Sequence, residues 1–148
     1  MASSYNNGKK ILYIGTFELP DKNAAALRVL GNAKAFRESG NEVIFAGVSQ
    51  EGCEDNIIKT KYETQGFQTY YRRRPDTLKE WFFFIDEIKQ YIQLIEYIKD
   101  IDIVIFYNFF STAMLRINKY CKKRGILCVA DITEWYSAKS RKFPVNVI

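Results

Sequence analysis

The chain has 148 residues, a formal net charge of +5 and 47% hydrophobic residues. This length suits one domain. A domain of this size buries about 68–70% of the surface of its unfolded chain, so it can form a core without disulfides or metal. The absence of histidine excludes histidine-based acid–base chemistry, histidine-anchored metal sites and a Ser-His-Asp triad within this chain. The three cysteines form no CxxC pair, which favours a reducing cytoplasm.

After a polar leader, the first predicted element is a strand. Lys10-Ile-Leu-Tyr-Ile-Gly15 is a short apolar run ending in glycine, which is typical of a strand buried on both faces. A loop containing Pro20 follows, and Asn23 is the expected N-cap of a helix that ends at Gly40. The apolar run at 42–47 predicts a second buried strand.

The segment from Gly47 to Arg74 is open to two interpretations. Residues 57–62 and 67–71 can pair as a hairpin around the turn at Gly66, or residues 54–63 can form a short crossover helix. We expect 67–71 to be the third strand and leave the preceding segment open.

Residues 77–99 predict one amphipathic helix, because isoleucine, leucine and aromatic residues recur there at helical spacing. This helix has more aromatic residues than the single apolar face of a helix can bury. We expect Trp81 and Phe82 to pack in the core, and Phe83 or Phe84 to be exposed to a missing domain, a second subunit or a membrane surface.

A fourth strand at 101–106, a helix beginning at Ser111 or Thr112, and a fifth strand at 126–130 complete the pattern. Strands that alternate with helices imply a Rossmann-like, doubly wound α/β fold with a mainly parallel sheet and helices on both faces. The expected strand order is 3-2-1-4-5. In such sheets, ligands bind beyond the carboxyl ends of the strands, near the switch point, which is the place in the sheet where the strand order reverses.

That rule selects the loops 15–23, 107–111 and 131–136. The stretch Asp131-Ile-Thr-Glu-Trp-Tyr136 combines carboxylates, which accept hydroxyl hydrogen bonds, with rings that stack on sugars. Alternatively, Asp131 caps a turn, Trp135 packs in the core and Ser111 only caps its helix. The candidate catalytic residue is Glu134, and the candidate substrate-binding residues are Gly15, Thr16, Asn23, Tyr107, Asn108, Asp131, Thr133 and Trp135.

Several apparent motifs do not point to a site. Asp100-Ile-Asp102 matches a metal-binding DxD pattern but falls between a helix and a strand, at the wrong edge of the sheet. Gly15 begins no dinucleotide fingerprint, because the next glycine is Gly31. We expect the basic cluster from Lys119 to Arg124 to be a solvated helix face, and we expect no nucleic-acid partner.

The segments 10–31 and 42–45, together with Asp102-Ile-Val-Ile-Phe-Tyr-Asn108 and Leu127–Tyr136, resemble the N-terminal domain of GT-B glycosyltransferases of the family-4 type. The resemblance implies two Rossmann-like domains, with the acceptor on the first and the nucleotide sugar gripped by paired glutamates on the second. By position, Gly15 and Thr16 match the loop that approaches phosphates. The loop containing Glu134 matches one where many relatives carry a histidine, which this chain lacks.

The resemblance further implies residues 9–136 as one domain, 1–8 as a leader and 137–148 as the start of a truncated continuation. It implies no cofactor in this chain and no metal. The expected partners are a C-terminal donor-binding domain of the same protein, a saccharide or lipid-linked acceptor, and the inner face of a cytoplasmic membrane. Surface polysaccharide synthesis is a fitting role, and the fragment alone should be inactive.

Two other classes of function remain. One is a sugar- or nucleotide-binding module without catalysis. The other is a flavodoxin-like or receiver-like signalling domain, although receiver chemistry needs an acidic cluster that the end of the first strand lacks.

Overall fold

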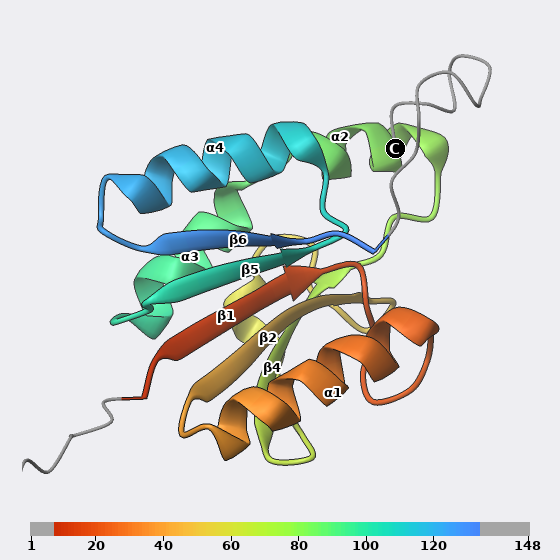
Figure 1. Cartoon of the computed structure of the whole chain (residues 1–148). Coiled ribbons are helices and arrows are strands. Elements are labelled where there is room, and N and C mark those ends of the chain that lie inside the picture. Colours follow the sequence, from red (N-terminus) through yellow and green to blue (C-terminus); the bar gives the residue numbers. More distant parts are fainter. Residues whose placement is uncertain (1–7, 134–148) are drawn as a thin grey trace, which may run out of the picture.

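The computed structural model describes residues 8–133, which form one α/β layer structure with helices on both faces of a single sheet (Figure 1). The strands are β1 Lys10–Gly15, β2 Glu42–Ser49, β3 Lys61–Thr64, β4 Phe67–Arg73, β5 Ile103–Tyr107 and β6 Leu127–Asp131. The helices are α1 Ala24–Glu38, α2 Leu78–Asp86, α3 Lys89–Ile98 and α4 Ser111–Lys122, with a short 3-10 helix, η1, at Ile57–Lys59.

The sheet order is β3-β4-β2-β1-β5-β6, so the predicted order 3-2-1-4-5 is wrong for the sheet as a whole. The prediction omitted β3, which pairs antiparallel with β4 at the edge; the five remaining strands are parallel. Gln65 and Gly66 join the two strands with φ values of 51° and 79°. Positive φ at both central residues is what a tight two-residue hairpin requires. The hairpin is therefore the correct interpretation of this segment, with bounds shifted from those expected.

Both faces of the central strands are buried, as the continuous apolar runs predicted. Alternate side chains of β1 contact opposite layers: Ile11 and Tyr13 pack with α1, whereas Leu12 and Ile14 pack with α3 and α4. On the α1 side, the ring of Phe45 meets the rings of Phe17 and Phe67 edge to face. The sheet is therefore held between two separate apolar layers.

The single helix predicted over 77–99 is wrong, because the chain breaks between α2 and α3. Glu87 takes an extended conformation, with φ −77° and ψ 112°. Its carbonyl accepts a hydrogen bond of 3.2 Å from Nη1 of Arg72, and its carboxylate lies 3.1 Å from Nη2 of the same guanidinium. A side chain from β4 thus occupies the break, which periodicity within the helix does not reveal.

The break also changes which aromatic residues are buried. Phe84 is buried, whereas Phe82 and Phe83 are 82% and 69% exposed. The expectation that Phe82 packs in the core is therefore wrong. The inward face of α2 is set by Phe84, whose ring contacts Trp81, Phe110 and the guanidinium of Arg72.

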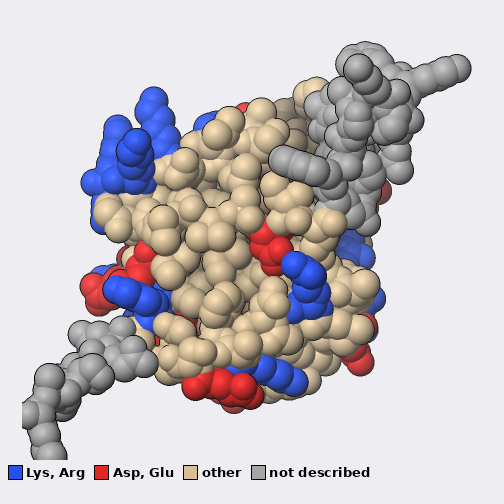
Figure 2. Space-filling model, viewed as in Figure 1, with Lys and Arg blue, Asp and Glu red and all other residues tan. Residues whose placement is uncertain are grey.

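The edge strand β6 is less covered than the central strands. Leu127 and Val129 are 59% and 40% exposed on the α1 side, where no described helix packs over this strand. Figure 2 shows this face as a largely uncharged area, with basic side chains gathered at the upper left over the end of α4. No helix in the described part of the chain is long and apolar enough to cross a membrane.

Candidate functional site

The carboxyl ends of β1, β5 and β6 lie side by side at one edge of the sheet. Gly15 is in register with Tyr107, which is in register with Asp131. The chain runs outward in one direction from β1 to β2 and β4, and in the other direction from β5 to β6. The switch point therefore falls between β1 and β5, where doubly wound sheets bind ligands.

At the end of β1, Gly15 is needed for close packing. A Cβ atom at this position would lie 2.9 Å from the carbonyl oxygen of Tyr107 and 3.0 Å from the ring of Phe17. Thr16 follows and is half-buried. The N-cap prediction for Asn23 is confirmed, because its Oδ1 accepts a 2.8 Å hydrogen bond from the backbone N–H of Ala26.

At the end of β6, the carboxylate of Asp131 accepts hydrogen bonds from three side chains. Tyr13 Oη and Asn32 Nδ2 donate to Oδ2, the latter at 3.3 Å, and Arg28 Nη2 donates to Oδ1 at 3.0 Å. Burial and then this carboxylate raise the pKa of Tyr13, which therefore stays a neutral donor. Asp131 thus ties β6 to β1 and α1.

Asn108 and Thr133, both exposed, form a reciprocal pair that brings two predicted site residues together. Asn108 Nδ2 donates to Thr133 Oγ1 at 2.7 Å, and the Thr133 backbone N–H donates to Asn108 Oδ1 at 3.1 Å. Asn108 has a φ of 42°, a conformation that asparagine tolerates better than most residues. Tyr107 is buried against the α1 layer. Glu134 and Trp135 lie outside the described residues.

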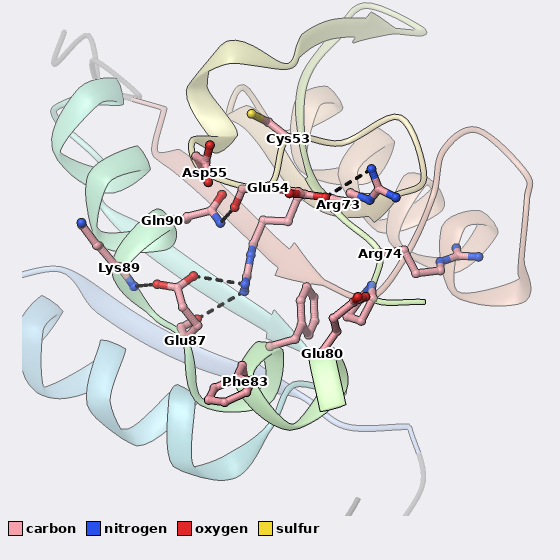
Figure 3. A pocket seen from close by; sticks show the side chains of 13 residues that line it. Cys53, Glu54, Asp55, Arg73, Arg74, Glu80, Phe83, Glu87, Lys89 and Gln90 are labelled. Atoms are coloured by element: carbon pink, nitrogen blue, oxygen red, sulfur yellow. Dashed lines mark hydrogen bonds and ion pairs between the residues drawn. The ribbon is translucent and has the colours of Figure 1, made fainter. Parts of the chain in front are cut away.

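A hollow lies elsewhere on the same edge of the sheet. A cavity of about 480 Å³ opens between the loop after β2, the end of β4, and the helices α2 and α3 (Figure 3). None of the predicted site residues that the structure describes lines it. One available signal was the run Arg72-Arg73-Arg74 at the end of a predicted strand.

Arg72 is the buried cation of this cavity, with 5% of its surface exposed. Its guanidinium carbon lies 4.1 Å from the centre of the Phe84 ring and 5.0 Å from that of Tyr91. Arg74 lies nearer solvent, and its Nη2 is 3.2 Å from a carboxylate oxygen of Glu18. Because Glu18 belongs to the loop after β1, this ion pair connects the cavity with the switch-point loops.

No group of three or more potential metal ligands occurs among the described residues. The Asp100–Asp102 pattern lies between α3 and β5, at the amino edge of the sheet, as expected. Asp102 accepts hydrogen bonds from the backbone N–H of Lys10 at 2.9 Å and from Nζ of Lys9 at 3.1 Å. These donors lower the pKa of Asp102, which acts as a connector between β1 and β5.

No protein-family model matches the chain, and no match was found among curated proteins or among solved structures. The class that the fold defines is therefore the broad one of Rossmann-like α/β domains with a mainly parallel sheet.

Proposed function

We propose that this chain is the acceptor-binding N-terminal domain of a GT-B glycosyltransferase of the family-4 type. The observation that carries the proposal is the meeting of the β1, β5 and β6 exit loops at the switch point of a doubly wound sheet. The same three segments carry the sequence resemblance to that family.

The donor is assigned to a second domain of the same protein. The loop after β1 lacks the glycine spacing that cradles a pyrophosphate, and Gly15 is packed against the end of β5. Transfer requires donor and acceptor to be held together in attack geometry. This domain alone is therefore expected to bind an acceptor without transferring a sugar to it.

Within the switch-point loops, Asp131 and the Asn108–Thr133 pair position the chain that leads into Glu134. A glutamate following this anchored segment can act as a base or orient an acceptor hydroxyl, a role worth roughly 10²–10⁴-fold in rate. Trp135 supplies a ring for stacking on a sugar, and Thr16 supplies a hydroxyl in the loop after β1. These roles, and that of Asn23, are part of the proposal.

The test is transfer measured by mass spectrometry over a panel of nucleotide sugars. The 148-residue chain should give no product, and the complete enzyme should give one. In the complete enzyme, Glu134→Gln should lower turnover without changing the melting temperature. Robust transfer by the chain alone contradicts the proposal. Saccharide binding by a complete protein that transfers nothing would instead identify a non-catalytic module.

A further inference from the structure

We propose that the cavity between β4 and the α2–α3 segment binds a neutral, hydroxyl-bearing ring, namely a sugar unit of the acceptor. The identification of this ring as acceptor rests on the proposed function. The cavity itself is independent of it and is distinct from the switch-point loops, since none of the described loop residues assigned to the site lines it.

The cavity is of ligand-binding size and is built from three separate parts of the chain. Its volume is about 480 Å³, within the range of roughly 300–1,000 Å³ that small-molecule sites occupy. Gln90 at the start of α3 donates a 2.6 Å hydrogen bond from Nε2 to the backbone carbonyl of Glu54, in the loop after β2. This bond fixes the walls on either side and is drawn in Figure 3.

The charges of the lining argue against an anionic ligand. Four basic side chains line the cavity, and four acidic ones do so as well. Arg72 is paired with Glu87 at 3.1 Å, and Arg73 with Glu54 at 3.3 Å. An anion would have to compete with carboxylates already in place, whereas a neutral polyol can bond to both kinds of group.

The polar groups that a ligand can reach are the exposed ends of the lining side chains. Arg72 and Gln90 are only 5% and 6% exposed, and Arg72 Nε and Gln90 Oε1 are closed off from solvent, so they lie behind the surface of the cavity. Arg73, Glu80 and Lys89 line the cavity and are exposed. Hydroxyl groups both donate and accept, so a sugar ring can donate to the carboxylate and accept from the two cations.

An exposed aromatic ring at the rim completes the site. Phe83 lines the cavity although 69% of it is exposed, and Figure 3 shows its side chain on α2, near Glu87. Such a ring can stack on the apolar face of a pyranose. Phe82, the preceding residue, is 82% exposed and does not line the cavity, which makes it a matched control.

The experiment is saturation-transfer NMR on the chain and its variants. The probes are methyl glycosides of glucose, galactose, mannose and N-acetylglucosamine, with inorganic phosphate as competitor. At least one glycoside should bind. Phe83→Ala should weaken that binding by about tenfold, a loss of the size expected for one stacking ring, and Phe82→Ala should not weaken it. Phosphate should not displace the glycoside. Both substitutions are at exposed positions, so the fold is retained.

Equal binding by both variants, displacement by phosphate, or no binding of any glycoside overturns the proposal. If a glycoside binds but Phe83 does not matter, the assignment of the cavity is wrong and the acceptor-domain function still holds. If binding depends on Phe83 but the complete protein transfers no sugar, the cavity site is correct and the glycosyltransferase function is wrong.

Discussion

The hydroxyl of Tyr13 on β1 donates a hydrogen bond to the carboxylate of Asp131 at the end of β6, across the intervening strand β5. Arg28 and Asn32 of α1 donate to the same carboxylate. Two strands, β1 and β6, and the helix α1 are therefore joined by side chains at the residue that begins the third candidate loop. Asp131 accordingly has a structural role, whatever the adjoining loop binds.

Asp131→Asn should lower the free energy of unfolding by about 1–3 kcal/mol, because an amide cannot accept from all three donors. Urea denaturation measures this loss. Asp21→Asn, at an exposed carboxylate in the loop after β1, is the matched control and should leave stability unchanged. An Asp131→Asn variant as stable as the parent chain would remove the structural role.

Asp102 should stabilise the fold in a pH-dependent way. The Lys10 N–H and Lys9 lower its pKa in the folded state, below the value of about 3.9 expected when unfolded. The stabilisation is thus present above about pH 4 and is lost as the pH falls through the folded pKa. Asp102→Asn should lower the melting temperature at pH 7, and the difference from the parent should shrink in acid. Asp100→Asn is the control, and an Asp102→Asn deficit that persists unchanged in acid would contradict this account.

Arg72→Lys should destabilise the junction of α2 and α3 although it keeps the charge. Lysine cannot stack as a plane between Phe84 and Tyr91 while bonding both the carbonyl and the carboxylate of Glu87. We expect a loss of about 1–3 kcal/mol and faster hydrogen exchange at residues 86–90. Unchanged exchange there would show that the guanidinium does not hold the break.

Neighbouring phenylalanines on α2 should respond very differently to truncation. Phe84→Ala removes a buried ring and should cost about 3–5 kcal/mol. Phe82→Ala removes an exposed ring and should change stability by no more than about 0.5 kcal/mol. Chemical denaturation of both variants measures the contrast, and similar losses would mean that α2 does not turn Phe84 to the core and Phe82 to solvent.

The elements that follow from local sequence were predictable. The apolar runs ending at Gly15 and Gly47 identify buried parallel strands, and Asn23 caps α1 as its side chain suggests. The sequence does not decide whether the short edge strand β3 forms, because the Gln65-Gly66 turn is a weaker hairpin signal than Asn-Gly.

The features that the sequence does not reveal depend on contacts between segments that are far apart in the chain. Arg72 from β4 fixes where α2 ends. The contacts of Phe84 fix which face of α2 is buried. The cavity needs the loop after β2, β4 and α2–α3 together, so no single motif marks it. The side-chain partners of Asp131 on β1 and α1 could likewise not be read from the sequence, because they lie about a hundred residues earlier in the chain.

Equilibrium dialysis of the unaltered chain against radiolabelled saccharides and nucleotide sugars tests the central claim most directly. An acceptor-binding domain without its donor-binding partner should retain a saccharide and should not retain UDP-glucose or GDP-mannose. Retention of a nucleotide sugar with no retention of any saccharide would contradict the account, because it would place the donor on this domain.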